Sequence, residues 1–180
     1  SISSSEGFKL TGGSSNLSGV GISSAGDINN DGFDDILIGA PQINSSTGTG
    51  SVDAGKTHII YGNNSDSQSD IDLTNINSGE GTSIQGETPD DLMGYSVAGL
   101  GDINGDGIDD FIIGAPLDST INSKAGSAYV IFGNESFHSQ STLNVSEITN
   151  GFVIRGSQTN GYLGIVSAAG DINGDGFNDI

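Results

Sequence analysis

The 180-residue chain contains no cysteine and no tryptophan, three prolines, and only four lysine and arginine residues in total. Without cysteine, neither a disulfide scaffold nor a thiolate metal site is possible. The basic residues are outnumbered by 23 aspartates and glutamates, and the formal net charge is −19. This balance excludes a nucleic-acid partner, because nucleic-acid-binding surfaces carry the opposite sign, and it excludes a polybasic membrane patch for the same reason.

Long hydrophobic runs and a leader sequence are also missing. The longest apolar runs, such as 36–38 and 111–113, are far shorter than the roughly 20 residues that a membrane-spanning helix needs. The first residues include neither a starting methionine nor a basic and apolar signal sequence. We therefore expect a mature product or a fragment of a larger protein, with no direct insertion into a membrane.

The acidic residues are concentrated in a segment that recurs three times. Residues 27–35 read Asp-Ile-Asn-Asn-Asp-Gly-Phe-Asp-Asp, and close copies occupy 102–110 and 171–179. The first aspartates of the copies are 75 and then 69 positions apart, and the three segments hold 11 of the 23 acidic residues. Such self-similarity at a fixed period indicates a repeat architecture.

The flanks of these segments repeat as well. An apolar triplet and Gly-Ala-Pro follow the first two copies, at 36–41 and 111–116. Small-residue segments precede the copies at 21–25, 96–100 and 165–169, and further matching segments lie at 55–63 and 126–134. A shorter element occurs at 8–11, 82–85 and 152–155. The sequence thus contains two repeats and the start of a third.

Short segments rich in β-branched and aromatic residues, bounded by Gly, Pro, Asn or Asp, are typical of strands. No window of 11 or more residues shows a helical period. Four short strands in about 70 residues describe one blade of a β-propeller. We predict an all-β fold of four-stranded antiparallel blades, an incomplete propeller of about two and a half blades. The intervening stretches 42–54, 64–81, 117–125 and 135–151 are predicted to be surface loops.

The acidic segments have the pattern of cation-binding loops. Oxygen-bearing side chains stand at positions 1, 3, 5 and 9, a backbone carbonyl at position 7 adds another oxygen, and Gly at position 6 allows a sharp turn. Position 4 is Asn30, Gly105 or Gly174, residues that tolerate a left-handed backbone. Hard oxygen ligands favour Ca²⁺ over zinc or copper, and Mg²⁺ is the weaker alternative because it demands octahedral geometry. The competing interpretation is a set of acidic hairpin turns, since Asn-Gly and Asp-Gly are common there.

An EF-hand begins with a similar pattern but does not fit. Its loop requires a bidentate Glu at position 12, where this chain has Ile38 or Ile113, and helices on both sides. The flanks here are predicted strands. The EF-hand and dockerin-like interpretations are therefore rejected.

The combination of a small-residue strand, Gly-Asp-Ile-Asn-x-Asp-Gly-x-x-Asp, an apolar triplet and Gly-Ala-Pro resembles the FG-GAP repeat. That repeat forms the β-propeller of integrin α-subunits, and it also occurs in bacterial surface proteins and in glycosylphosphatidylinositol-specific phospholipase D. The Gly-Ala-Pro half is intact at 39–41 and 114–116, whereas the Phe-Gly half is degenerate, as in Met93-Gly94. The resemblance implies that each loop joins the first two strands of a blade, opposite the ligand-binding face.

The resemblance also implies the boundaries and the ligands. It places repeat 1 at 1–75, repeat 2 at 76–149 and a partial repeat 3 at 150–180. Up to three Ca²⁺ ions are expected, each held by four side chains and one carbonyl, the carbonyls being those of Phe33, Ile108 and Phe177. The implied ligand sets are Asp27, Asn29, Asp31, Phe33 and Asp35; Asp102, Asn104, Asp106, Ile108 and Asp110; and Asp171, Asn173, Asp175, Phe177 and Asp179. The position-8 residues Asp34 and Asp109 fall outside the pattern and are expected to face solvent.

No segment has the pattern of an active site. His58 occupies the place of Tyr129 in the matching strand, which indicates a packing role, and His138 lies in a polar stretch without a motif. The segment 94–98 lacks the second Gly of a nucleophile elbow, and there is no phosphate loop or dinucleotide fingerprint. We therefore expect a non-enzymatic chain.

Three classes of function remain open. The first is a Ca²⁺-stabilised extracellular or cell-surface module that binds a protein or glycan, as in cell adhesion, with the remaining blades supplied by a parent protein. The second is an accessory propeller of a secreted phospholipase or glycosidase. The third is a structural array in a surface layer. Extracellular calcium, near millimolar, matches the weak end of the affinities of such loops.

Overall fold

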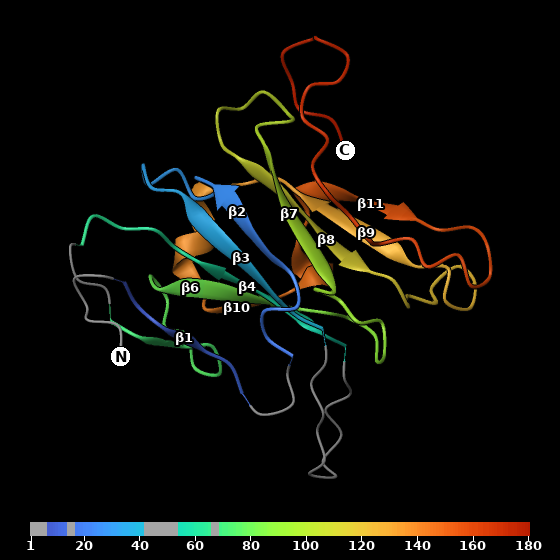
Figure 1. Cartoon of the computed structure of the whole chain (residues 1–180), viewed down its shortest axis with the longest axis horizontal. Helices are drawn as coiled ribbons and strands as arrows, with labels where there is room; N and C mark the ends of the chain where they lie inside the picture. Colours follow the sequence, from blue (N-terminus) through green and yellow to red (C-terminus); the bar gives the residue numbers. More distant parts are fainter. Residues whose placement is uncertain (1–6, 14–16, 42–53, 66–68) are drawn as a thin grey trace.

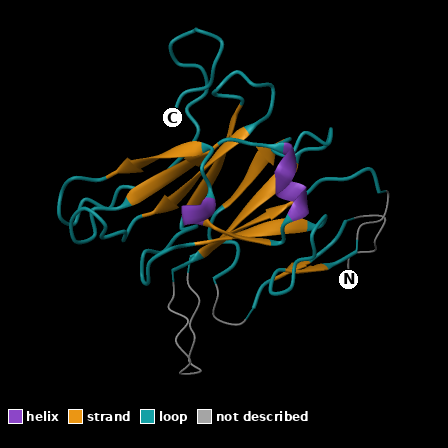
Figure 2. Ribbon diagram, turned by 180° about the vertical axis from the view of Figure 1, so that it is seen from behind, coloured by secondary structure: helices purple, strands orange, loops and turns teal. Residues whose placement is uncertain are grey.

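Two β-sheets packed face to face form the body of the molecule in the computed structural model (Figures 1 and 2). The structure describes residues 7–13, 17–41, 54–65 and 69–180. Most of the predicted loop at 42–54 therefore lies outside the described residues. Within the described ranges, the helices are two short 3₁₀ turns, η1 (Glu135–Ser139) and η2 (Val145–Glu147), and no helix is long and apolar enough to cross a membrane.

The first sheet has an antiparallel core of three strands predicted for repeat 1 and one from the start of repeat 2. Its strands β2 (Ile22–Gly26), β3 (Asp35–Ala40), β4 (Lys56–Ile60) and β6 (Gly81–Gln85) lie in the order β2-β3-β4-β6. Leu37 pairs with Ser23 on one side and with Ile59 on the other. A fifth strand, β10 (Thr142–Asn144), comes from repeat 2 and joins β6 in parallel.

The second sheet repeats this arrangement. It contains β7 (Ser96–Gly101), β8 (Asp110–Ala115), β9 (Ser127–Ile131) and β11 (Gly151–Arg155), all antiparallel. The predicted all-β class and the four-stranded blades are confirmed. The chain is a partial β-propeller, with two blades and the beginning of a third.

A small third sheet repeats the contact between β6 and β10. Strand β1 (Leu10–Thr11) pairs in parallel with β5 (Ile71–Asp72). In the sequence, Leu10 lies two residues before Gly12, just as Ile84 of β6 lies two residues before Gly86. Ile84 pairs with Leu143 of β10. The element at 8–11 is therefore the counterpart of β6, an outer strand whose own sheet is not among the described residues.

The sheets do not begin and end where the sequence repeats do. Strand β6 completes the first sheet, so the predicted boundary between residues 75 and 76 falls inside that sheet, and β11 extends the second sheet past residue 149. The stretch 165–169, predicted as a strand, forms none, because it has no ladder partner among the described residues. Only a single bridge between Gly170 and Asp179 closes the third acidic segment.

Two predicted loops contain short elements. The stretch 64–81 includes β5, and 135–151 includes η1, β10 and η2. Both fold inward because isolated apolar side chains, such as Ile71 and Phe137, are buried against the sheets. Their spacing has no strand or helix period, which is why the sequence predicted only loops.

The main hydrophobic core lies between the two sheets. Inward side chains of both sheets meet there, among them Leu37 and Ile59 of the first and Phe111 and Ile113 of the second, all fully buried. Two smaller clusters lie on the outer faces, one around Ile38 and Ile60 and the other around Leu100 and Val130. The alternation of faces along each strand thus gives each sheet two apolar faces, as a propeller blade requires.

Candidate metal centre

The three acidic loops lie along one edge of the molecule. Residues 27–35 join β2 to β3, and residues 102–110 join β7 to β8. Residues 171–179 form a projecting loop at the top of Figure 1, close to the C-terminus. The loops are neighbours in space, since Asp109 contacts Asp27 and Asn178 contacts Leu100.

The backbone of each loop turns as the sequence predicts. Position 4 is left-handed at Asn30, Gly105 and Gly174, with φ of 59°, 80° and 78°. Position 6, always glycine, has φ between 91° and 95° in all three loops. A side chain with a Cβ would be strained at position 6, whereas asparagine tolerates this region at position 4. The three loops therefore share one fold.

The position-1 aspartates hold the loops together by accepting backbone N–H groups. Asp27 accepts from Asp31 and Gly32 at 3.0 and 2.8 Å. Asp102 and Asp171 each accept from three N–H groups, at positions 4, 5 and 6 of their loops. These donors, led by the Gly176 N–H, lower the pKa of Asp171. Position 1 is thus a preorganised carboxylate facing into the turn.

Positions 3 and 5 continue the same pattern. In each loop the position-3 asparagine Oδ1 accepts the N–H of position 5, at 2.8–3.0 Å. The position-5 aspartate accepts the N–H of position 7, at 2.9–3.0 Å. The backbone at position 7, whose carbonyl is the remaining predicted ligand, is therefore held in the same way in all three loops.

The position-9 aspartates anchor the loops to the sheets. Asp35 and Asp110 are fully buried, and each accepts the N–H of position 2 and the N–H of the glycine that follows the third strand of the sheet, Gly62 or Gly133. Asp179 accepts the first of these donors, the N–H of position 2, from Ile172 at 2.9 Å. Burial raises the pKa of Asp35 to about 7, and it raises the pKa of Asp110 as well.

The donor set fits a hard cation, but the carboxylates do not converge fully. Among the described residues, no three acidic or histidine side chains are close enough together to hold a metal ion. Each carboxylate or amide oxygen that accepts one N–H keeps a further lone pair, so these hydrogen bonds leave room for coordination. In the first loop, Asn29 is 2% exposed and its Nδ2 has no hydrogen-bond partner. The chemistry of the donor set, carboxylate and amide oxygens without sulfur, therefore suits an oxygen-bound cation.

Residues of repeat 2 contact the first loop, and the sequence did not predict these contacts. The Asn30 amide donates to Glu135 at 3.1 Å, and His138 Nε2 lies 3.2 Å from the Asp31 carboxylate. The His138 ring also contacts the Tyr61 ring, with centroids 4.7 Å apart. Because these partners are about 70 to 110 residues apart in sequence, no local motif could have identified them.

The prediction for position 8 is wrong for one of its two residues. Asp34 is exposed as expected. Asp109 is only partly exposed, and it accepts the Asp27 N–H at 2.8 Å. Loop 2 faces a neighbouring blade on that side, and the carboxylate meets a backbone donor there instead of solvent.

The histidine predicted to pack does so. His58 is 3% exposed on the outer face of the first sheet, and its Nδ1 lies 2.8 Å from Ser83 Oγ. Burial lowers the pKa of His58 to about 4, with the nearby Lys56 charge adding to the effect. His58 is therefore a neutral, structural side chain.

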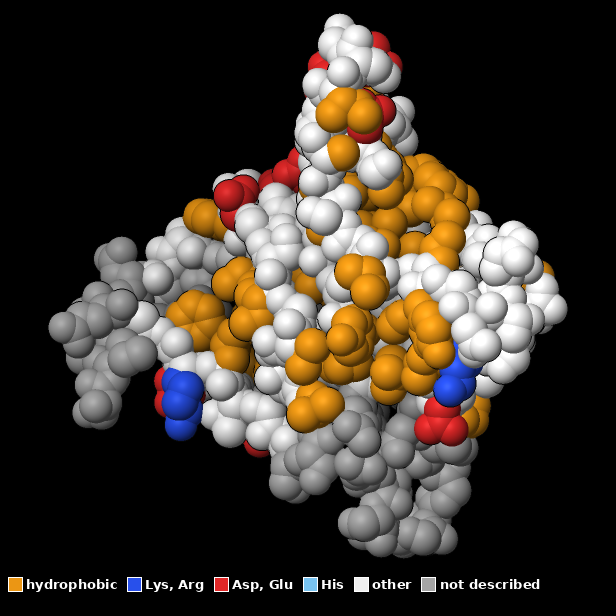
Figure 3. Space-filling view, turned by 45° about the vertical axis from the view of Figure 1, so that its right-hand side comes forward, with side chains coloured by type: hydrophobic (Ala, Val, Ile, Leu, Met, Phe, Trp, Pro, Cys, Tyr) orange, Lys and Arg blue, Asp and Glu red, His pale blue; other side chains and the backbone are white. Residues whose placement is uncertain are grey.

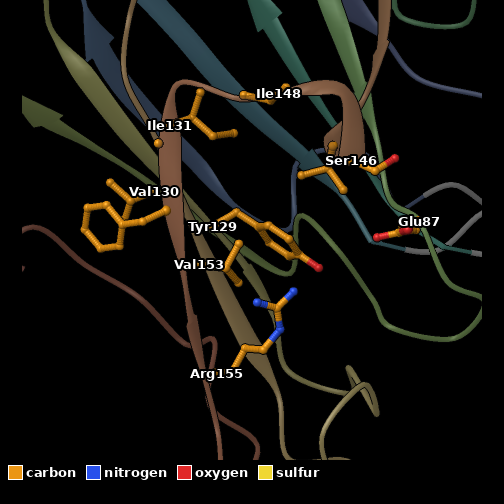
Figure 4. Close-up of a pocket in the computed structure, with 11 residues that line it drawn as sticks. Glu87, Tyr129, Val130, Ile131, Ser146, Ile148, Val153 and Arg155 are labelled. Carbon is orange, nitrogen blue, oxygen red and sulfur yellow. The ribbon is translucent and has the colours of Figure 1, made fainter.

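A cavity of about 190 Å³ lies away from the acidic loops, between β9, β11 and η2 (Figure 4). Glu87 and Arg155 supply its charged groups, and Tyr129 and Ser146 supply its hydroxyl groups. The Tyr129 hydroxyl donates to the buried Asp118 carboxylate at 3.3 Å. The cavity lining contains no histidine and no cysteine.

Comparisons with known proteins agree with the repeats in the structure. A model of the FG-GAP repeat matches residues 19–59 and 93–131, which cover β2 to β4 and β7 to β9. The chain is similar to phosphatidylinositol-glycan-specific phospholipase D of Rattus norvegicus, with 31% identity over 160 residues, 88% of this chain and 17% of that protein. It is also similar to integrin alpha-5 of Xenopus laevis, with 30% identity over 160 residues, 87% of this chain and 14% of that protein.

Integrin alpha-6 of Homo sapiens matches over 92 residues at 34% identity, 51% of this chain and 7% of that protein. The chain therefore spans less than a fifth of the length of these relatives. The sequence order of motifs, the two four-stranded blades and the matched repeat model all agree. The chain therefore contains two FG-GAP repeats, each within a four-stranded blade, and part of a further blade.

Proposed function

We propose that this chain is a calcium-binding propeller module that acts in recognition outside the cell, through an extracellular protein or glycan. The observation that carries the calcium proposal is the repetition of one loop conformation three times, each with three aspartates, one asparagine and one carbonyl. Oxygen-only donor sets of this kind suit Ca²⁺. A simple acidic turn requires neither oxygen-bearing side chains at positions 1, 3 and 5 nor a buried carboxylate at position 9.

Calcium would act on these loops by neutralising charge. The loops concentrate carboxylates in a chain of net charge −19, and the raised pKa of Asp35 reflects the cost of burying a charge beside Asp27 and Asp31. A bound cation removes that cost and stabilises the folded state alone, because the unfolded chain has no assembled loop. The proposed role of calcium is therefore to fix the blades rather than to catalyse a reaction.

The test is thermal unfolding followed by circular dichroism, in EDTA and then in rising Ca²⁺ or Mg²⁺. At calcium concentrations about 100 times Kd, each site should add about 2.7 kcal/mol, which in a chain of this size raises the midpoint by several degrees. The matched control is the triple variant Asp31→Ala, Asp106→Ala, Asp175→Ala, which removes position 5 from every loop. A folded chain whose midpoint does not respond to Ca²⁺ would reduce the loops to acidic turns.

The recognition role is the part of the proposal that depends on the relatives. Integrin alpha chains align with most of this chain, and the loops connecting the blades at the edge opposite the acidic loops would be the contact surface. The test is a pulldown and a glycan array with the calcium-loaded chain. The triple variant provides the control, and the absence of any calcium-dependent ligand would count against this role.

A second role is favoured by a specific observation. Two phosphatidylinositol-glycan-specific phospholipase D sequences align with 88% of this chain, yet the chain covers only 17% of each. We therefore consider an accessory propeller attached to a secreted enzyme as the second candidate. A catalytic domain in the flanking sequence of the parent gene would favour it over adhesion.

Neighbouring blades are the partners that the exposed surface suggests. Apolar side chains gather on one face below the projecting acidic loop (Figure 3). Between residues 150 and 170, the large exposed apolar residues are Phe152, Ile154, Tyr162 and Ile165. Their exposure is that of a blade face without its neighbour, since sheet faces of propellers are normally covered. We propose that further blades of a parent protein cover this face.

A further inference from the structure

Asp109 makes two hydrogen bonds with Asp27, the first residue of the neighbouring acidic loop. Its Oδ2 accepts the Asp27 N–H at 2.8 Å, and its own N–H donates to the Asp27 carbonyl at 3.3 Å. Both backbone polar groups of Asp27 are therefore held by one residue that lies 82 positions away in sequence. Asp109 belongs to the second sheet's loop, so this contact crosses from blade to blade.

The space for this contact is provided by Gly26. A Cβ at residue 26 would overlap the Asp109 carboxylate, and the backbone there is left-handed, with φ of 74°. The next pair of loops has a related contact. Asn178, the position-8 residue of the third loop, lies over Gly101 and donates to the Leu100 carbonyl at 2.7 Å. In both cases, position 8 contacts the backbone at or just before the start of the preceding loop.

The orientation of Asp27 affects the turn of the first loop. Its carboxylate accepts the N–H groups of Asp31 and Gly32 and supplies the predicted position-1 ligand. A rotation of the peptide planes beside Asp27 would move that carboxylate away from the turn. Asp109 itself precedes Asp110, the buried position-9 residue of the second loop. One short segment therefore connects the ligand sets of two loops.

We propose that Asp109 is a positioning residue that fixes Asp27 for cation binding and couples the first two loops. This inference rests on the proposed calcium function. Asp109 does not itself contact the cation in this account; it acts through the backbone of Asp27. A matched control is present in the chain, because Asp34 is the same residue type at the same loop position and is exposed.

The experiment isolates the first loop. In the background Asp106→Ala, Asp175→Ala, the second and third loops each lose their position-5 ligand, and Ca²⁺ is titrated by calorimetry. Loss of a hydrogen bond to an ionised group predicts that Asp109→Ala weakens Ca²⁺ binding about fivefold or more. Asp109→Asn, whose Oδ1 still accepts the Asp27 N–H, should restore the affinity to within about twofold of the background. Asp34→Ala should leave it unchanged.

The outcomes separate the inference from the function on which it rests. No Ca²⁺ binding in the background would overturn the calcium function at this loop, and the inference with it. Binding that is unaffected by Asp109→Ala in a folded chain would overturn the inference alone. A merely structural role would lower the unfolding midpoint in EDTA without changing the Kd of the folded protein. Should Asp109→Ala not fold, Asp109→Glu, which displaces the acceptor by one methylene, gives the same test.

Discussion

The backbone of Gly39 lies against the carbonyl oxygen of Gly94, and a Cβ at residue 39 would overlap that oxygen. The same relationship joins Gly114 to Gly164. Gly39 and Gly114 begin the two Gly-Ala-Pro segments, whereas Gly94 and Gly164 stand where the repeat has its Phe-Gly half. The two halves of the motif thus meet between consecutive blades.

Gly39→Ala should destabilise the chain by about 2–3 kcal/mol, because the added methyl group would push the two sheets apart. Gly79→Ala is the matched control: Gly79 has φ of 91° but open space around its Cβ position, so only about 1 kcal/mol of backbone strain is expected. Urea unfolding of both variants measures the difference. Equal losses of unfolding free energy in the two variants would show that the close approach of Gly39 to Gly94 does not hold the two blades together.

His58 should make the chain less stable as the pH falls from about 6.5 towards 4. Its folded pKa of about 4 lies below the ordinary value of 6.5, so the unfolded state binds more protons in this window. The contribution of His58 should decline by about 1.4 kcal/mol per pH unit there and be constant above pH 7. Urea unfolding at several pH values should therefore show a shallower pH dependence for His58→Gln than for the unsubstituted chain. Parallel curves would contradict the neutral, buried state of His58.

Thr82→Val should cost about 1–3 kcal/mol, because it leaves the buried Tyr61 hydroxyl without its partner. The two hydroxyl oxygens are 2.7 Å apart, and Thr82 Oγ1 also donates towards the carbonyls of Phe137 and Gln140, which fixes η1 on the first sheet. In the double variant Thr82→Val, Tyr61→Phe, the cost should be smaller than the sum of the single costs. Strict additivity in urea unfolding would mean that the two hydroxyls act independently.

The sequence predicted the elements whose signals are local. The strands follow from β-branched runs, and the left-handed positions of the acidic loops follow from Asn30 and from the glycines at positions 4 and 6. The buried role of His58 followed from its alignment with Tyr129. All of these were visible because the repeat aligns each residue with a counterpart of the same structural role.

The features that were missed depend on contacts between repeats. Three such contacts join residues more than 50 positions apart in sequence: the pairing of β10 with β6, the contact of η1 with Thr82, and the hydrogen bonds between Asp109 and Asp27. His138 had no motif around it, yet it contacts Asp31. The sequence periodicity gives the blade, but the packing of one blade on the next is set by side-chain shape and by backbone groups that no periodicity specifies.

The most direct test of the calcium account is the number of ions bound per chain. The EDTA-treated and dialysed chain is titrated with Ca²⁺ by calorimetry, with Mg²⁺ and the triple variant Asp31→Ala, Asp106→Ala, Asp175→Ala as controls. The account predicts saturable binding of up to three Ca²⁺ ions, tighter than that of Mg²⁺, and none in the triple variant. A folded chain that takes up no Ca²⁺ at millimolar concentration, or equal uptake by the triple variant, would contradict it.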